Sequence, residues 1–162
     1  MSIQLINASA EHQPVIANMM QFYMYDFSEY TGSDLETNGL FADYPHLDDY
    51  WEKDEQRFAY IIQREEKHAG FILVRFIESQ EKKYFSIAEF FILRKYQRKG
   101  LGRIVANLIF DLYRGPWEVY QMEANKPAQV FWRKVIHDYT HGQFNERIES
   151  RRTIQSFTNE NL

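Results

Sequence analysis

The sequence predicts a mixed α/β (α+β) fold, because strand-like and helix-like segments alternate along its 162 residues. Two neighbouring segments carry this prediction. Apolar residues in "LGRIVANLIFDL" (101–112) recur at steps of three and four, which is typical of an amphipathic helix. The preceding "YFSIAEFFIL" (84–93) is apolar, aromatic and nearly continuous, which favours a strand buried on both faces. Alternation of this kind indicates helices layered on a sheet.

The N-terminal part predicts one strand and two helices. A short strand is expected at 3–8, followed by a helix whose apolar stripe runs from Val15 to Phe27. Residues 31–40 are rich in Gly, Ser, Asp and Asn and therefore predict a loop. A short helix that starts at Pro45 is expected next, since proline suits a first helical turn.

The centre of the chain predicts a pair of strands before the two segments described first. "FAYIIQ" (58–63) and "AGFILVRFI" (69–77) are separated by the charged turn 64–68. Gly115 and Pro116 are expected to stop the helix that begins at residue 101.

The C-terminal part predicts a strand, a helix and a closing hairpin. "WEVYQM" (117–122) has the pattern of a strand. A second helix is indicated by apolar residues between 128 and 136, and it is expected to end before Tyr139. The segments 141–148 and 151–158 are expected to form the hairpin.

Length and composition suit a single domain that spans residues 1–162, since no repeat, low-complexity tract or linker divides the chain. The absence of cysteine excludes disulfides, thiolate zinc sites and a cysteine nucleophile. We find no leader pattern at the start, and no apolar run of about 18 residues. These features predict a soluble cytoplasmic protein that does not enter membranes.

Charge is distributed unevenly along the chain. Residues 1–60 carry eleven acidic and two basic side chains, a net charge of −9, whereas the remainder carries seventeen basic and twelve acidic ones, +5. This asymmetry is consistent with two charged ligand surfaces, and equally with solvated faces that keep the protein soluble. The overall charge of −4 argues against nucleic-acid binding, which needs a concentrated basic face.

The segment "YQRKGLGR" (96–103) places two glycines and three cations, Arg98, Lys99 and Arg103, where a strand gives way to a helix. A helix N-terminus offers unpaired N–H groups and a partial positive charge, and glycines let a ligand approach the main chain. A phosphate or pyrophosphate is therefore the expected ligand. Neither GxxxxGK[ST] nor GxGxxG is present, but residues 97–102 satisfy [RQ]xxGx[GA].

In this motif and its surroundings the sequence resembles the GNAT superfamily of acetyl-CoA-dependent N-acetyltransferases. "EFFILRKYQRKGLG" (89–102) is similar to the family's fourth strand and pyrophosphate loop, and "NKPAQVFWRK" (125–134) to a later segment that lines the pantetheine arm. The resemblance covers most of the chain and is weakest in residues 1–60. It implies a single domain with a mixed central sheet of about six or seven strands flanked by helices.

The resemblance also implies acetyl-CoA as co-substrate, no metal, and a set of coenzyme-binding positions. In the family, a main-chain N–H of the fourth strand polarises the thioester carbonyl, which corresponds here to Ile92 or Leu93. The implied coenzyme-binding residues are Ile92, Leu93, Arg94, Gln97, Arg98, Lys99, Gly100, Leu101, Gly102 and Arg103, together with Asn125, Ala128, Phe131 and Trp132.

The catalytic groups of the family are only partly matched. Ser86 stands where several members carry a glutamate, and Trp132 stands where the family often has a tyrosine acid. Glu89 is the only carboxylate on the expected strand and is the candidate general base, acting directly or through a water. The same carboxylate is equally consistent with a structural role, paired with a neighbouring base.

Two further residue groups have structural explanations. His137 and His141 have a spacing that suits zinc on a helix, but no third ligand is apparent, so we expect no metal site. Trp117 is expected in the core. For Phe131 and Trp132, the sequence is consistent either with the core or with the coenzyme channel.

The sequence thus predicts an N-acetyltransferase that acts on a primary amine in a ternary complex with acetyl-CoA. The acidic residues 1–60 favour a small cationic acceptor or a basic peptide. The alternative is a non-catalytic acyl-CoA-binding module of the same fold, and a third interpretation is transfer of a longer acyl group. A homodimer is common in the family, but no residue pattern here indicates one independently.

Overall fold

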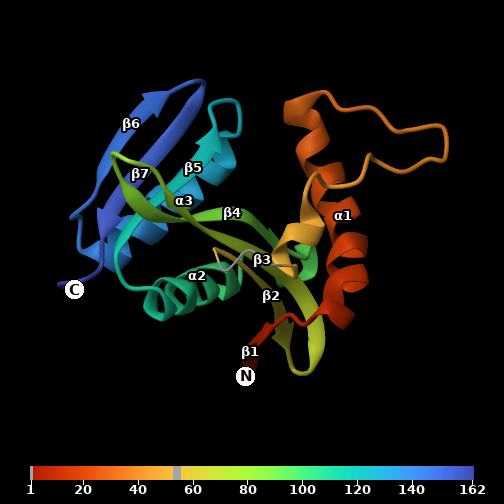
Figure 1. Cartoon of the computed structure of the whole chain (residues 1–162), viewed down its shortest axis with the longest axis horizontal. Coiled ribbons are helices and arrows are strands. Elements are labelled where there is room, and N and C mark those ends of the chain that lie inside the picture. The colour runs from red at the N-terminus through yellow and green to blue at the C-terminus, as the bar shows by residue number, and fades with distance from the viewer. Residues whose placement is uncertain (1, 53–55) are drawn as a thin grey trace. The chain divides into compact units, whose positions relative to one another are not determined.

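A computed structural model describes residues 2–52 and 56–162 of the chain. Asp54 and Glu55, counted above among the acidic residues, lie outside the described residues. The elements follow in the order β1 (Ile3–Asn7), η1 (Ala10–His12), α1 (Gln13–Thr31), η2 (Leu47–Tyr50), β2 (Arg57–Arg64), β3 (Lys67–Glu78), β4 (Lys83–Ile92), η3 (Arg94–Tyr96), α2 (Leu101–Leu112), β5 (Pro116–Met122), α3 (Lys126–Thr140), β6 (Asn145–Glu149) and β7 (Arg152–Thr158) (Figure 1).

The strands form one seven-stranded sheet in the order β1-β2-β3-β4-β5-β7-β6. β4 and β5 run parallel, whereas β1 with β2, β5 with β7 and β6 with β7 are antiparallel. The sheet is therefore mixed, and the fold class predicted from the sequence is confirmed. The chain divides into two compact units, residues 1–73 with 89–93 and residues 74–88 with 94–162.

In the first unit, α1 has a partly aromatic face that packs against residues of the strands. Ile16 and Met20 are buried, and the ring of Tyr23 lies 5.8 Å from that of Phe71 and 6.1 Å from that of Phe91. The helix ends at Gly32, whose φ of 69° is a left-handed conformation suited to glycine. The N-terminal helix prediction is thus confirmed.

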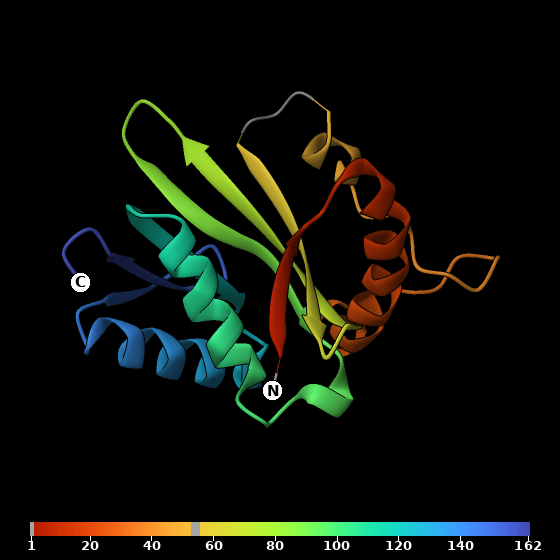
Figure 2. The same ribbon diagram turned by 90° about the horizontal axis from the view of Figure 1, so that it is seen from below.

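The loop after α1 extends away from the helix and returns to it (Figures 1 and 2). Its return is fixed by the side-chain amide of Gln21, which donates to the carbonyl of Phe41 at 3.1 Å and accepts its N–H at 2.9 Å. The short helix expected from Pro45 is a 3-10 turn that starts later, at Leu47, because His46 adopts a left-handed conformation.

The second unit has an aromatic core beneath α2 and α3, which lie side by side in Figures 1 and 2. Trp117 of β5 is fully buried, and its ring lies 5.0 Å from that of Phe110 on α2 and 6.4 Å from that of Phe157 on β7. The expectation that Trp117 belongs to the core is confirmed. Asn159 closes this core with hydrogen bonds to the backbone of Phe110 and Gly115.

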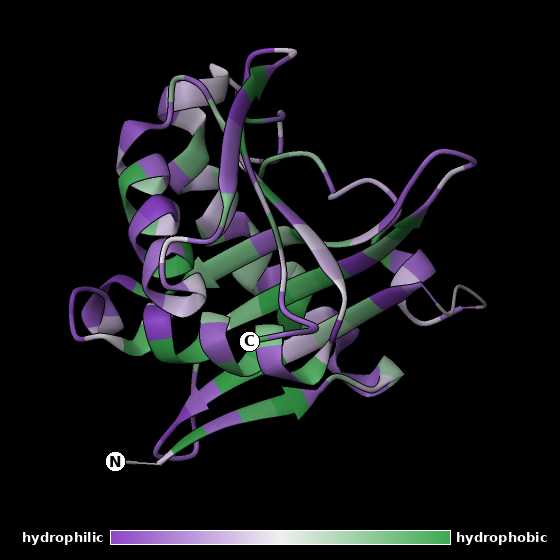
Figure 3. Cartoon of the chain, turned by 90° about the vertical axis from the view of Figure 1, so that its left-hand side faces the viewer, coloured by the Kyte–Doolittle hydropathy of each residue, from purple (hydrophilic) through white to green (hydrophobic). Residues whose placement is uncertain are grey.

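The helices of the second unit differ from the sequence pattern in two respects. Coloured by hydropathy, the helices show hydrophobic and hydrophilic faces side by side (Figure 3). The buried face of α2 nevertheless excludes part of the expected stripe, since Ile104, Leu108 and Leu112 are exposed. The prediction that the next helix ends before Tyr139 is wrong, because α3 continues to Thr140.

In the parallel pairing of β4 with β5, Phe85 lies opposite Trp117 and Ser86 lies opposite Glu118. β4 begins at the exposed Lys83, is half-buried at 84–85 and 88–90 and is buried at 86–87 and 91–92, so it is not buried on both faces throughout as expected. Within the described residues, no helix has both the length and the apolar character needed to cross a membrane.

Candidate functional site

The loop between β4 and α2 turns sharply before the helix begins. The N–H of Gln97 donates to the carbonyl of Arg94 at 3.0 Å, and Arg98 has a φ of 59°. Gly100 occupies the N-cap of α2 with a φ of 80°, a conformation that other residues adopt only at a cost. The glycine therefore lets the chain enter the helix directly from the turn.

Three cations surround this helix N-terminus. Arg98, Lys99 and Arg103 are exposed, and within the described parts of the chain none of them has a carboxylate partner. A Cβ at Gly100 would meet no atom within 4 Å, so the main chain there faces open space. Unpaired helix N–H groups, full positive charges and an open approach together suit an anion.

The start of α3 is fixed by a side-chain cap. Asn125 is buried, and its Oδ1 accepts the N–H of Ala128 at 3.2 Å. Gln129, also buried, donates its amide to the carbonyls of Met122 and Glu123 at 2.9 and 2.8 Å. Asn125 therefore has a structural role at the helix N-terminus, and its contact with coenzyme stays a prediction.

The aromatic residues of α3 differ in their exposure. Trp132 is only 6% exposed, and its ring lies 5.0 Å from that of Phe131 and 6.5 Å from that of Phe110. Ala128 and Phe131 are half-buried. Trp132 thus belongs to the core of the second unit, while Phe131 and Ala128 keep surface that a ligand can reach.

Glu89 of β4 lies in the first unit beside two phenols. The hydroxyl of Tyr44 donates to its Oε1 at 3.1 Å, and Tyr23 also hydrogen-bonds to the carboxylate. Burial raises the pKa of Glu89 above its ordinary value, although both phenol hydrogen bonds act to lower it. Among residues 2–52 and 56–162, the partners of the carboxylate are these two tyrosines, and no basic side chain forms the ion pair that a structural role would need.

Tyr23 serves as a donor in this group. Burial raises the pKa of Tyr23 well above its ordinary value, and the neighbouring Glu89 carboxylate raises it further. The phenol therefore stays protonated at neutral pH. Its role toward Glu89 is to donate a hydrogen bond, not to remove a proton.

Main-chain contacts near the end of β4 are close. The N–H of Leu93 donates to the carbonyl of Ala69 at 2.8 Å, so a thioester carbonyl would have to compete with Ala69 for this donor. A Cβ at Gly70 would collide with the carbonyl oxygen of Phe91, which explains a glycine inside strand β3. The polarising roles of Ile92 and Leu93 stay predictions.

A comparison with protein families matches residues 19–137 to the acetyltransferase (GNAT) family. The chain belongs to this family. The match includes Glu89, the loop between β4 and α2, and the first part of α3, which are the segments on which the resemblance was based.

Solved structures of acetyltransferases share the fold at low sequence identity. An acetyltransferase from Thermus thermophilus has a TM-score of 0.69 and 16% identity, with 98% of each chain covered. The PaiA N-acetyltransferase from Thermoplasma acidophilum, solved in complex with coenzyme A, has a TM-score of 0.61 and 12% identity, covering 98% of this chain and all of the other. An acetyltransferase of the GNAT family from Streptococcus pneumoniae has the same TM-score, identity and coverage. A comparison with curated proteins found no match.

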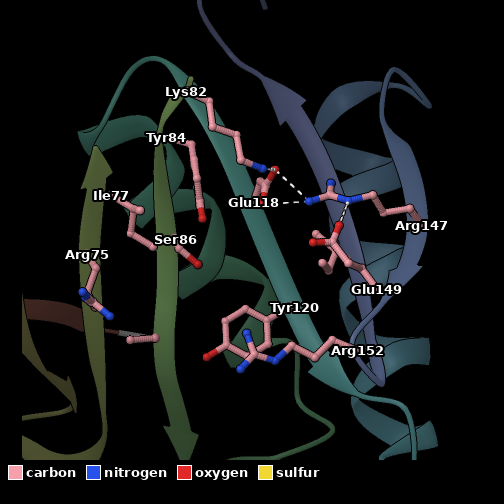
Figure 4. A pocket seen from close by; sticks show the side chains of 12 residues that line it. Arg75, Ile77, Lys82, Tyr84, Ser86, Glu118, Tyr120, Arg147, Glu149 and Arg152 are labelled. Atoms are coloured by element: carbon pink, nitrogen blue, oxygen red, sulfur yellow. Dashed lines mark hydrogen bonds and ion pairs between the residues drawn. The ribbon is translucent and has the colours of Figure 1, made fainter. Parts of the chain in front are cut away.

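In this GNAT chain, Ser86 occupies the position where several family members carry a glutamate, and its surroundings differ from those of Glu89. Ser86 is only 2% exposed, and in the strand register it lies opposite Glu118 of β5 in the second unit. It lines a pocket of about 360 Å³ (Figure 4). Ser86 therefore brings a hydroxyl, not a carboxylate, to that pocket.

The histidine pair of this GNAT chain is separated by the helix end. His137 lies on α3 with its ring 3.4 Å from Asp138, whereas His141 follows the helix with a φ of 53°. Among residues 2–52 and 56–162, no group of three or more His, Asp or Glu side chains is arranged to hold a metal ion.

Sequence reasoning missed three residues that shape the surroundings of Glu89. Tyr23 falls within the apolar stripe predicted for the first helix, and no sequence pattern distinguishes Tyr44 or Gly70. The available signals were weak: a glycine inside an apolar strand, and tyrosines, whose hydroxyls need partners when buried. Nothing in the sequence indicates which carboxylate they meet.

Proposed function

We propose that this chain transfers an acetyl group from acetyl-CoA to a primary amine by direct attack in a ternary complex. Membership of the GNAT family supports acyl transfer, and a structural neighbour was solved with coenzyme A. The observation that carries the proposal is the open N-terminus of α2 with its three exposed cations, Arg98, Lys99 and Arg103. This arrangement suits a pyrophosphate.

Each group has a role in this proposal. The N-terminus of α2 and its cations hold the pyrophosphate, and a main-chain N–H at Ile92 or Leu93 polarises the carbonyl. Acetyl-CoA supplies the thioester that reacts with the amine. Phe131 and Ala128, the half-buried residues of α3, contact the pantetheine arm.

Glu89 is the proposed general base. An amine attacks only when it is neutral, so a proton must leave it before or during transfer. A buried carboxylate whose pKa is raised is a stronger base than an ordinary one, and the pKa of Glu89 is raised by burial. Two phenol donors keep its carboxylate oriented.

The proposed acceptor is cationic, a small polyvalent amine or a basic peptide. Support comes from the net charge of −9 on residues 1–60, where Glu29 of α1 and Asp34, Glu36 and Asp43 of the loop after it are exposed. A diamine should therefore be acetylated more efficiently than a monoamine of equal length, and the difference should shrink as salt screens the attraction. Preference for acidic acceptors would contradict this part of the proposal.

Coenzyme binding is best tested at Gly102. Any side chain at Gly100 strains the backbone through its φ of 80°, whereas Gly102 lies in the first turn of α2 and does not have a positive φ. Calorimetry should show coenzyme A binding weakened at least tenfold, about 1.4 kcal/mol, in Gly102→Asp. Arg103→Gln should weaken binding as well, and the exposed Lys67→Gln on β3 should not. Unchanged affinity in a folded Gly102→Asp variant would refute the pyrophosphate assignment.

Catalysis is tested separately from binding. Thiol release from acetyl-CoA should depend on an added amine, and the product should carry the acetyl group on nitrogen. Tight coenzyme binding without thiol release across a broad amine panel would favour the non-catalytic module. A clear preference for a larger thioester would favour longer acyl groups.

A further inference from the structure

The pocket of the second unit is lined by one face of the sheet. Strand side chains alternate between faces, and Trp117 packs against α2, so Glu118 and Tyr120 of β5 point to the opposite face. Figure 4 shows these side chains with others from neighbouring strands around one hollow. The lining residues are Arg75, Ile77, Lys82, Tyr84, Ser86, Ala88, Glu118, Tyr120, Arg147, Glu149, Arg152 and Ile154.

One part of this pocket is electrically balanced. Glu118 accepts Lys82 Nζ at 2.8 Å and Arg147 Nη2 at 3.1 Å, and Arg147 Nε donates to Glu149 at 2.9 Å. The hydrogen bond from Arg147 holds the pKa of Glu149 below its ordinary value. Two cations and two carboxylates thus neutralise one another there.

Among the residues that the structure describes, Arg75 and Arg152 have no carboxylate partner. Arg152 lies over the ring of Tyr120, with its guanidinium carbon 4.5 Å from the ring centre. Arg75 is half-buried, and its guanidinium has no hydrogen-bond or ion-pair partner among the side chains that the structure describes. The pocket therefore carries an excess of two positive charges, both on guanidinium groups.

The chemistry of these groups selects a class of ligand. A half-buried guanidinium without a partner has lost hydration, and a carboxylate or phosphate compensates this loss with paired hydrogen bonds. The buried Ser86 and the hydroxyl of Tyr84 add neutral donors in the same hollow. Stacking on Tyr120 limits the freedom of Arg152, which lowers the entropic cost of binding.

We propose that this pocket binds the oxyanion group, a carboxylate or a phosphate, of a small molecule other than coenzyme A, through Arg75 and Arg152. None of the residues implied for coenzyme binding lines the pocket. Its volume of about 360 Å³ is in the range of small-molecule sites, about 300–1,000 Å³. The charge of the pocket is opposite to that expected for the cationic acceptor's surface, so the site goes beyond the proposed function.

Amide chemical shifts of the ¹⁵N-labelled full chain provide the test, with inorganic phosphate and succinate as separate probes. Saturating coenzyme A is present throughout, so that phosphate cannot report on the α2 N-terminus. Either probe should shift the amides of Ser86 and Tyr120 with a dissociation constant on the order of millimolar. The two probes distinguish a phosphate from a carboxylate ligand.

Variants decide whether the two arginines are responsible. Arg75→Gln and Arg152→Gln should each weaken binding at least fivefold, and Arg152→Lys should weaken it less because it keeps the charge without the planar fork. Glu118→Gln should tighten binding, because it removes a negative charge from the pocket. Lys83→Gln, on β4 but outside the pocket, should change the constant less than twofold.

Two outcomes would overturn the proposal. One is an absence of shifts at these amides for both probes under saturating coenzyme A, which would restrict anion binding to the coenzyme loop. The other is binding that persists unchanged in folded Arg75→Gln and Arg152→Gln. No acetyl transfer is measured, so the result is independent of whether the proposed catalysis occurs.

Discussion

Tyr44 donates its hydroxyl to Oε1 of Glu89 across 3.1 Å and so links the loop after α1 to the strand that carries the candidate base. Gln21 holds the same loop by pairing with the backbone of Phe41. Tyr23 contacts Glu89 from α1. The basicity of Glu89 is thus set by two opposing effects: burial, which raises its pKa, and two phenol donors, which lower it.

Removing one donor should shift the pH dependence of catalysis. In Tyr44→Phe the carboxylate of Glu89 loses a hydrogen bond that favours its charged form, so its pKa rises further. A general base works only when ionised. The acid limb of the kcat/KM profile should therefore move to higher pH, while the alkaline limb stays in place.

The control for this shift is Tyr25→Phe, which removes the hydroxyl of a largely exposed tyrosine on α1. Its profile should match that of the parent chain. An acid limb that moves to lower pH in Tyr44→Phe, or does not move at all, would show that Glu89 does not control the rate.

Glu89→Gln should separate function from stability. Because the pKa of Glu89 is raised in the folded chain, the folded state binds more protons than the unfolded state between its ordinary and raised pKa, and stability falls as pH rises through that window. The neutral amide removes this loss and can still accept from the phenols. Urea unfolding at neutral pH should therefore give a free energy of unfolding at or above that of the parent.

Activity should respond in the opposite sense. Loss of a general base typically costs about 10²–10⁴-fold in rate, and Glu89→Gln should show a fall in kcat of that order. A variant that loses more than about 1 kcal/mol of stability but keeps its kcat would identify Glu89 as a structural carboxylate.

Local patterns predicted the elements and the sharp loop before α2 well, whereas coenzyme binding at that loop stays a prediction. The bounds of α2 at Leu101 and Leu112 follow from apolar period and glycine placement, both of which can be observed within one segment. The buried face of α2 could not be predicted, because apolar residues occupy more than one face and tertiary packing selects among them. Ile104 is 40% exposed for this reason, whereas Ala106 is buried.

The surroundings of the candidate base were less accessible to sequence reasoning. Tyr44 and Glu89 are 45 positions apart, and no periodicity relates a loop residue to a strand. Arg75 lies on β3 and Arg152 on β7, two strands that are far apart in the chain and that the sheet places on either side of β4 and β5. For the pocket that these arginines line, the sequence offered one signal, which is the ionisable Arg75 inside an apolar strand.

Gly70→Ala should destabilise the first unit. The added Cβ would collide with the carbonyl oxygen of Phe91, and the backbone cannot yield as a flexible side chain would. We expect a loss of about 1–3 kcal/mol in chemical unfolding. Hydrogen exchange at the amide of Leu93, which donates to Ala69, should accelerate more than the global loss explains.

The matched substitution on the same strand is His68→Ala, where the side chain is exposed. It should change stability by less than about 0.5 kcal/mol. A Gly70→Ala variant as stable as the parent, with the Leu93 amide equally protected, would mean that β3 and β4 are farther apart than this contact requires.

Trp132→Phe tests the residue that replaces the tyrosine acid of the family pattern. An indole N–H can donate a hydrogen bond but is no general acid near neutral pH, and a thiolate with a pKa near that of cysteine, about 8.5, is a good leaving group without one. Trp132 is only 6% exposed and packs against Phe131 and Phe110. Its replacement should therefore affect core packing, and with it stability, before it affects the reaction. We expect Trp132→Phe to lower the free energy of unfolding by about 1–3 kcal/mol while keeping most of kcat.

The kinetic constants decide between packing and chemistry at this position. If α3 positions the pantetheine arm, Trp132→Phe should raise KM for acetyl-CoA with little change in kcat, the signature of lost uniform binding. Trp132→Tyr should keep the rate, and should raise it if the new hydroxyl reaches the sulfur. A hundredfold fall in kcat for Trp132→Phe, in a folded chain that binds acetyl-CoA normally, would show that the indole acts in the transition state and that its core position does not describe its role.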